Sequence, residues 1–109
     1  RVLFVAGQTG VAPGETGGGE ALFVAQFGEA LRRVLRVVQV AGGYTLDVGR
    51  MTVFVTDMEL YRRSRKALSV TWKAHMGDHY PAMALVEVKS LVDPQAKVEI
   101  EATAVIGGL

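Results

Sequence analysis

The 109-residue sequence predicts a single α+β domain, residues 1–109, in which two helices cover one face of a β-sheet. Three observations support this class. Half of the residues are hydrophobic and 21% are charged, as in ordinary globular proteins. Two long segments have apolar residues at helical spacing, and four short segments are rich in β-forming residues. These segments follow one another in the order β-α-β-α-β-β.

The first half of the chain contains one strand and one helix. Arg1–Ala6 (RVLFVA) is a continuous apolar run, which predicts a strand buried on both faces. Glycine-rich Gly7–Glu20 predicts a loop, and it lacks the Gly-Lys-Ser/Thr pattern of a phosphate-binding loop. A helix is expected from Glu20 to Ala41, ended by Gly42 and Gly43. Its apolar positions are Val24, Phe27, Leu31, Val34, Leu35 and Val38.

The middle of the chain contains the second strand and the second helix. Val48–Thr56 alternates between apolar side chains and others, which predicts a strand. Asp57 is a good N-cap for a helix that runs to about Met76 and stops at Gly77. Trp72 lies at a helical spacing that is more typical of a core residue than of a ligand platform.

Two strands are expected near the C-terminus. Ala82–Lys89 follows Pro81, a residue that sheets tolerate only at a strand start or an edge. Lys97–Ile106 alternates strictly, so Glu99 and Glu101 share one face of it. Paired carboxylates can divide acid and base roles, but two solvated glutamates would have the same spacing.

The composition argues against several classes of protein. A net charge of +1 gives no electrostatic attraction to nucleic acid, and the basic cluster Arg62–Lys66 is more typical of a solvated helix face. Cysteine is absent, which excludes disulfides and thiolate chemistry. His75 and His79 are four residues apart, but Gly77 interrupts the helix between them, so no metal site is expected. No segment is long enough to cross a bilayer and no signal peptide is recognisable, so we expect a cytoplasmic protein.

Five motifs together resemble the RidA/YjgF family, the reactive-intermediate deaminases that are also known as translation inhibitors or endoribonucleases. They are VAGQTG (Val5–Gly10), AGG (Ala41–Gly43), DVGRMTVFVTDM (Asp47–Met58), YPAMALVEV (Tyr80–Val88) and VEIEATAVI (Val98–Ile106). The resemblance implies a chorismate-mutase-like α+β fold with a mixed sheet. It also implies a barrel-like homotrimer with small-molecule clefts at the subunit interfaces, and neither a cofactor nor a metal. The family's Gly-Pro-Tyr segment would precede Arg1, so we expect an N-terminal segment to be missing.

The resemblance also assigns roles to individual residues. The family's Glu-Ile-Glu motif places its water-positioning glutamate at Glu99, the expected catalytic residue. Its Pro-Ala-Arg motif, whose arginine binds a substrate carboxylate, reads Pro-Ala-Met here and places Met83 at that position. The family's small hydroxyl residue falls on Ala6, and a helix residue that is often asparagine falls on Arg65. The expected cleft is lined by Gly7, Met83, Leu85 and Glu99, with Arg65 as a further ligand-binding residue.

These departures predict a small-molecule-binding protein or hydrolase that is not a typical 2-imino-acid deaminase. A thioether cannot replace the planar fork with which arginine holds a carboxylate. One alternative is an active imine or enamine deaminase in which Arg65 anchors the carboxylate. A second alternative is an RNA-acting endoribonuclease or translation inhibitor. For the trimer, we expect the sheet face carrying Val53, Val55 and Leu85 to have no cover within one chain and to be buried between copies.

Overall fold

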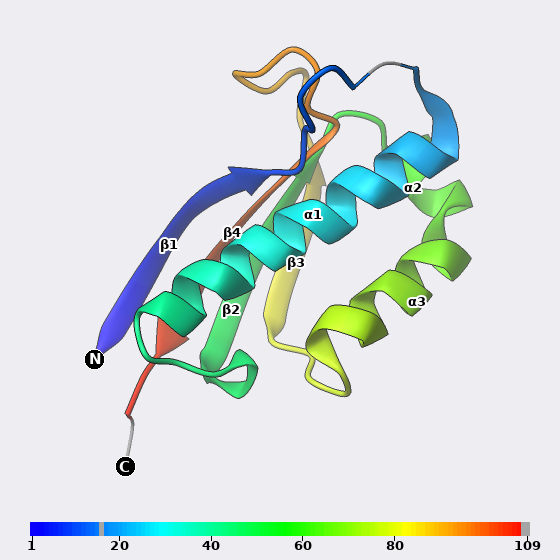
Figure 1. The fold of residues 1–109 in the computed structure, drawn as a ribbon. Coiled ribbons are helices and arrows are strands. Elements are labelled where there is room, and N and C mark those ends of the chain that lie inside the picture. The colour runs from blue at the N-terminus through cyan, green and yellow to red at the C-terminus, as the bar shows by residue number, and fades with distance from the viewer. Residues whose placement is uncertain (16, 108–109) are drawn as a thin grey trace.

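The computed structural model describes residues 1–15 and 17–107, and its elements follow the predicted order (Figure 1). The second predicted helix is divided into two. The elements are β1 (Val2–Thr9), α1 (Gly19–Val40), a short 3-10 turn η1 (Thr45–Asp47), β2 (Val48–Val55), α2 (Met58–Arg63), α3 (Arg65–Met76), β3 (Ala82–Glu87) and β4 (Val98–Val105).

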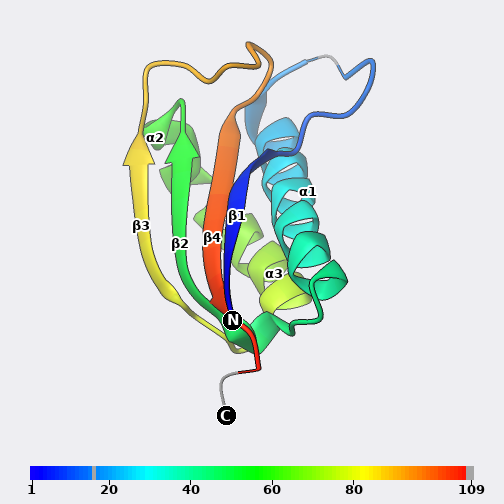
Figure 2. The same ribbon diagram turned by 90° about the vertical axis from the view of Figure 1, so that its left-hand side faces the viewer.

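The four strands form one mixed sheet in the order β1-β4-β2-β3. Strand β4 is antiparallel to both β1 and β2, whereas β2 and β3 are parallel. The helices lie on one side of this sheet, and the other side is left open (Figure 2). Strands β1 and β3 stand at the two ends of this strand order, so both are edge strands. An edge is one of the positions at which a sheet tolerates a proline such as Pro81, which precedes β3.

The core lies between the sheet and the helices. Strand β4 alternates as predicted, with Val98, Ile100, Ala102 and Ala104 buried on the helix side. The helical spacing of α1 is confirmed by its buried residues, which are Phe23, Gln26, Phe27, Ala30, Leu31, Val34 and Val38. Burial of this kind stabilises a fold by about 25 cal/mol per Å² of apolar surface.

The prediction about which sheet face lacks a cover was wrong. Val53 and Val55 are fully buried, because their face of the sheet is the one that the helices cover. The uncovered face carries Phe4, which is 80% exposed, and Phe54 and Thr103 from the central strands. The alternation of side chains along β2 separated its two faces, but it did not show which face the helices would cover.

Strand β1 is not buried on both faces as predicted. It is an edge strand in which only Val5 is buried, while Val2 and Phe4 are exposed. It also extends to Thr9, so the first residues of the predicted loop belong to the strand. Thr16, in the same predicted loop, lies outside the described residues.

The second predicted helix is interrupted at Ser64, between α2 and α3. Asp57 is the N-cap, as predicted, and its carboxylate accepts a hydrogen bond of 3.0 Å from the amide of Leu60. Gly77 ends α3 with a φ of 61°, a conformation that glycine adopts without a steric cost. Trp72 is buried in the core, as expected.

The side chain of Gln26 on α1 holds two loops in place by hydrogen bonds. Its side chain is fully buried, and its amide nitrogen donates to the Glu15 carboxylate at 2.7 Å and to the Gln95 carbonyl at 3.0 Å. Its amide oxygen accepts from the backbone of Lys97 at 2.7 Å. One buried amide therefore connects the loop after β1 with the loop before β4. Among the described residues, no helix is long and apolar enough to cross a membrane.

Candidate functional site

Glu99 and Gly7 lie side by side on the open face of the sheet. In register, Glu99 lies between Thr9 of β1 and Phe54 of β2. A Cβ atom on Gly7 would overlap the Glu99 carboxylate and would lie 2.7 Å from its Cδ atom. The absence of a side chain at Gly7 is therefore what allows the Glu99 carboxylate to lie against the β1 backbone.

A β-bulge brings these two residues together. Val5 is opposite Ala102 and Gln8 is opposite Ile100, so strand β1 has one more residue than β4 in this interval. The extra residue lies in the Ala6–Gly7 pair. Bulges of this kind redirect the chain and are common beside active sites. Ala6, where the resemblance expects a hydroxyl, is exposed next to Gly7.

Met83, Leu85 and Arg65 line a different surface, a groove of about 250 Å³ between α3 and the edge strand β3. We call it the β3 groove. Most of its lining is apolar or aromatic, and Arg65 is the one cation among the described residues that line it. It is lined by Phe27, Tyr61, Arg65, Leu68, Ser69, Trp72, Tyr80, Met83 and Leu85.

The stacked aromatic wall of the β3 groove was missed by the sequence analysis, which favoured a core position for Trp72 over a role as a ligand platform. The rings of Trp72 and Tyr80 are stacked, with centroids 5.8 Å apart and planes inclined by 13°. The indole nitrogen of Trp72 donates to the His79 carbonyl at 3.2 Å, which fixes the ring. Tyr80 remains 69% exposed. Strand alternation did not signal this position, because Tyr80 precedes β3 and would share a face with Ala82 rather than with Met83.

One copy of the chain does not bring the predicted site residues together. In parallel register, Met83 is opposite Met51 and Leu85 is opposite Val53, both of which are buried under the helices. Met83 and Leu85 therefore belong to the helix side of the sheet, whereas Glu99 lies on the open side. A cleft that contains all of these residues requires a second copy.

Arg65 is exposed at the rim of the β3 groove. Its Nε atom makes one long hydrogen bond, 3.4 Å, to the carbonyl of Arg62. The neighbouring Arg62 and Arg63 approach Glu59 and Glu20 at 3.8 and 3.6 Å. Arg65 has no such carboxylate within ion-pair distance among the described residues, so its guanidinium is available to a ligand.

The two histidines point to different places. His79 Nε2 lies 2.7 Å from the Val48 carbonyl oxygen, and His75 lies between α1 and α3. No group of three or more histidine, aspartate or glutamate side chains that could hold a metal occurs in residues 1–15 and 17–107.

Comparison with known proteins agrees with the resemblance. Residues 1–106 match the family model described as Endoribonuclease L-PSP. The 2-iminobutanoate/2-iminopropanoate deaminase of Escherichia coli is 34% identical over 108 residues, covering 96% of this chain and 80% of that protein. The crystal structure of the E. coli YjgF gene product superposes with a TM-score of 0.78 at 30% identity, covering 95% of this chain and 80% of that one.

A second similar structure is that of E. coli TdcF with bound serine. It superposes with a TM-score of 0.77 at 30% identity and covers 95% of this chain and 80% of that one. Both the family model and these relatives extend over nearly the whole chain. The chain therefore belongs to the RidA/YjgF family and has its chorismate-mutase-like α+β fold.

Proposed function

We propose that this protein binds and hydrolyses, or only binds, a small molecule in clefts between copies of the chain, and that it is not a typical 2-imino-acid deaminase. The observation that carries the proposal is the division of the site residues. Gly7 and Glu99 form one half-site on the open sheet face, and Arg65, Met83 and Leu85 form another in the β3 groove. Two neighbouring copies of a homotrimer would supply one half-site each.

Glu99 is the proposed catalytic residue. Its carboxylate lies against the backbone at Gly7 and accepts no hydrogen bond from the described residues. A carboxylate in this state can orient a water molecule or accept its proton. An imine carbon is the kind of electrophile that such a water attacks, and ammonia leaves when the carbinolamine collapses. Related proteins are named as imine deaminases, which supports this reaction class.

Met83 is the reason to expect a different substrate. It lies in the β3 groove and is 43% exposed. The resemblance assigns to this position the arginine that binds a carboxylate in the family. Each hydrogen bond to a charged group contributes about 1.5–3 kcal/mol, so the loss of two weakens binding by roughly two to four orders of magnitude. The thioether and its aromatic neighbours suit a ligand with an apolar group better than they suit 2-iminopropanoate.

Arg65 supports a second candidate, an active deaminase with a substituted anchor. It lines the same groove as Met83, and its guanidinium has no carboxylate partner among the described residues. In this case the substrate carboxylate would bind at the rim of the groove and its side chain would lie against Trp72 and Tyr80. The serine bound to TdcF is a small molecule that carries a carboxylate, as this candidate requires.

One assay separates these candidates. Imines are generated from amino acids by an amino-acid oxidase, and ammonia release is followed with and without the protein. No acceleration with the imine of alanine supports the first candidate. Acceleration that Arg65→Ala abolishes supports the second. Glu99→Gln is the control for either activity, and salt-dependent RNA binding without any imine hydrolysis would instead favour the endoribonuclease class.

A further inference from the structure

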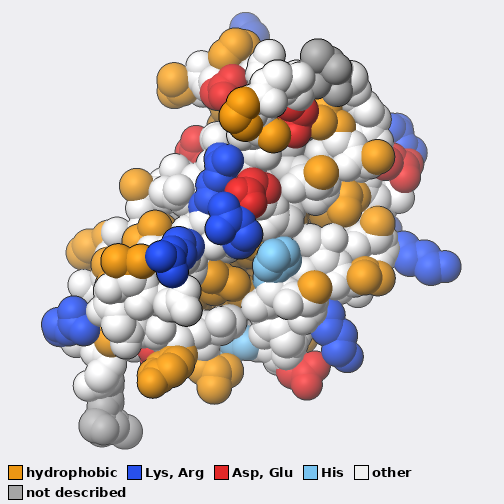
Figure 3. Space-filling model, in the orientation of Figure 1, with side chains coloured by type: hydrophobic (Ala, Val, Ile, Leu, Met, Phe, Trp, Pro, Cys, Tyr) orange, Lys and Arg blue, Asp and Glu red, His pale blue; other side chains and the backbone are white. Residues whose placement is uncertain are grey.

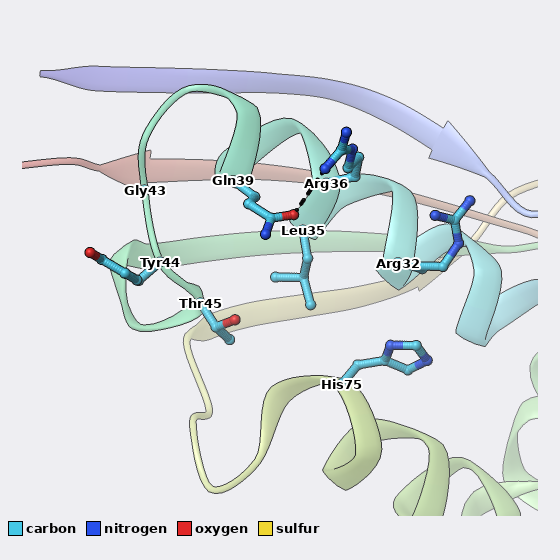
Figure 4. Close-up of a pocket in the computed structure, with 8 residues that line it drawn as sticks. All are labelled: Arg32, Leu35, Arg36, Gln39, Gly43, Tyr44, Thr45 and His75. Atoms are coloured by element: carbon cyan, nitrogen blue, oxygen red, sulfur yellow. Dashed lines mark hydrogen bonds between the residues drawn. The ribbon is translucent and has the colours of Figure 1, made fainter.

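A second groove lies on the helix side of the molecule, away from both half-sites. It has a volume of about 520 Å³, roughly twice that of the β3 groove. We call it the α1–α3 groove. Figure 4 shows that its side chains come from the C-terminal half of α1, the turn that follows it, and the end of α3. It is lined by Arg32, Leu35, Arg36, Gln39, Gly43, Tyr44, Thr45 and His75.

The polar side chains of this groove are hydrogen-bond donors or can act as donors. Arg36 Nη1 donates to Gln39 Oε1 at 3.2 Å, which occupies the amide oxygen and leaves the amide nitrogen to the groove (Figure 4). The Thr45 hydroxyl and the His75 imidazole make no hydrogen bond to any other described residue. Within the described part of the chain, no aspartate or glutamate lines the groove. Side chains that can all donate, with no carboxylate among those described, suit a ligand that is rich in acceptor oxygens.

The carboxylates that lie close to the lining residues are already engaged. Asp47 Oδ2 accepts from the backbone amide of Tyr44 at 2.6 Å. Glu29 accepts hydrogen bonds from Arg32 at 2.8 Å and from Arg33 at 3.1 Å. The hydrogen bond from Arg32 holds the pKa of the Glu29 carboxyl below its usual range, so Glu29 stays ionised and bound to these arginines. Arg36, one turn further along α1, has no carboxylate within ion-pair distance among the described residues. In the space-filling view, basic side chains cluster over α1 and a histidine lies beside them (Figure 3).

Close contact between the helices positions His75. A Cβ atom on Gly28 would lie 3.1 Å from Thr71 Cγ2 and 3.6 Å from His75 Nε2, so glycine lets α3 approach α1 here. His75 is half-buried as a result, and its ring is held near Arg32 at the edge of the groove (Figure 4). Leu35 forms an apolar floor between these polar groups.

We propose that the α1–α3 groove is a second ligand site, for a small organic anion. Its phosphate or carboxylate oxygens are bound by Arg36 and His75, and its apolar part lies on Leu35. Arginine side chains bind both kinds of anion through paired N–H groups. The volume is within the range of about 300–1,000 Å³ that is usual for small-molecule sites. Because the groove is on the helix side, packing of copies through the open sheet face leaves it accessible.

Two titrations of the intact protein at constant ionic strength test this proposal. One uses inorganic phosphate and the other uses malonate. Backbone amide shifts measured by NMR report where each anion binds. We expect saturable shifts in residues 32–45 and around His75, with a dissociation constant on the order of 1 mM. Phosphate alone indicates a phosphorylated ligand, malonate alone indicates a carboxylate ligand, and both indicate a site for either anion. No saturable shift with either anion overturns the proposal.

Variants make the test specific to the groove. Arg36→Gln and His75→Gln are each expected to weaken binding at least about tenfold, because each removes a charge-assisted hydrogen bond. Gln39→Glu places a carboxylate in the groove and is expected to abolish binding. The matched control is Arg62→Gln, which removes the same charge from an exposed side chain on α2. If Arg62→Gln weakens binding as much as Arg36→Gln, the anions bind through general charge and the proposed site is refuted. Circular dichroism checks that each variant is folded.

Discussion

At the scale of single residues, the resemblance assigns two departures from the family's deaminase motifs to this chain. It expects a carboxylate-binding arginine at the position of Met83 and a hydroxyl at the position of Ala6. Both replacements remove polar groups from the proposed cleft. The neighbouring Gly7 and Glu99 keep the close contact that the proposed water-activating role requires.

Met83→Arg is expected to produce measurable hydrolysis of 2-iminopropanoate where the wild type has almost none. The new guanidinium would supply the planar fork that a carboxylate needs. The gain should be incomplete, because Ala6 still lacks a hydroxyl. Ammonia release with an amino-acid oxidase measures it, with Arg65→Ala as the comparison. A wild type that is already active, and that Arg65→Ala does not impair, would show that the interpretation of Met83 is wrong.

Gly7→Ala is expected to reduce ligand binding or turnover at least about tenfold while the fold stays intact. The added methyl group would overlap the Glu99 carboxylate and displace it. Gly18→Ala is the matched control, since no atom of the described residues, apart from the two chain neighbours, lies within 4 Å of a Cβ at that position. Equal activity of both variants would mean that the position of the Glu99 carboxylate does not matter.

At the scale of elements, buried polar groups decide where the helices and loops lie. Ser64 interrupts the second predicted helix, and its buried hydroxyl oxygen has no hydrogen-bond partner among the residues that the structure describes. Apolar spacing alone predicted one continuous helix here, because it contains no information about the break. Gln26 differs from Ser64 in this respect, since both polar atoms of its buried side chain are hydrogen-bonded.

Gln26→Ala is expected to lower the free energy of unfolding by about 1–3 kcal/mol, because it leaves the partly buried amide of Lys97 without its side-chain acceptor. Urea denaturation of the purified protein measures the change. Gln39→Ala, on the exposed side of the same helix, should alter stability by less than about 0.5 kcal/mol. A similar small effect at Gln26 would show that the loops it connects are held by other contacts.

At the scale of the whole molecule, one face of the sheet remains uncovered. Phe4 is 80% exposed and Val105 is 50% exposed on that face, together with Phe54. The helices lie entirely on the other side (Figure 2). Apolar surface of this kind in a small protein is typical of an interface between subunits.

We expect the protein to be a trimer in solution, with the open sheet faces turned toward one another. Light scattering coupled to size-exclusion chromatography measures the mass. Phe4→Glu is expected to shift the protein toward the monomer by placing a charge in the interface. Val70→Glu is the control, because Val70 is equally apolar and 71% exposed but lies on α3. A wild-type monomer at micromolar concentration would contradict both the assembly and the shared cleft.

The sequence by itself determined the family, the order of the elements, and the alternation that separates Glu99 from the core residues Val98 and Ile100. These features depend on local periodicity and on motifs, which a single chain displays directly. It also identified Gly7, Glu99, Arg65, Met83 and Leu85 as residues of interest.

Only the tertiary structure decided how these residues are distributed. The order of the strands makes β1 an edge strand, and the position of the helices buries Val53 and Val55 rather than the opposite face. Both outcomes depend on contacts between segments far apart in the sequence, and the pattern within one strand does not contain them. The same contacts place Glu99 and Met83 on opposite sides of the sheet, and they create the α1–α3 groove from residues that no motif connects.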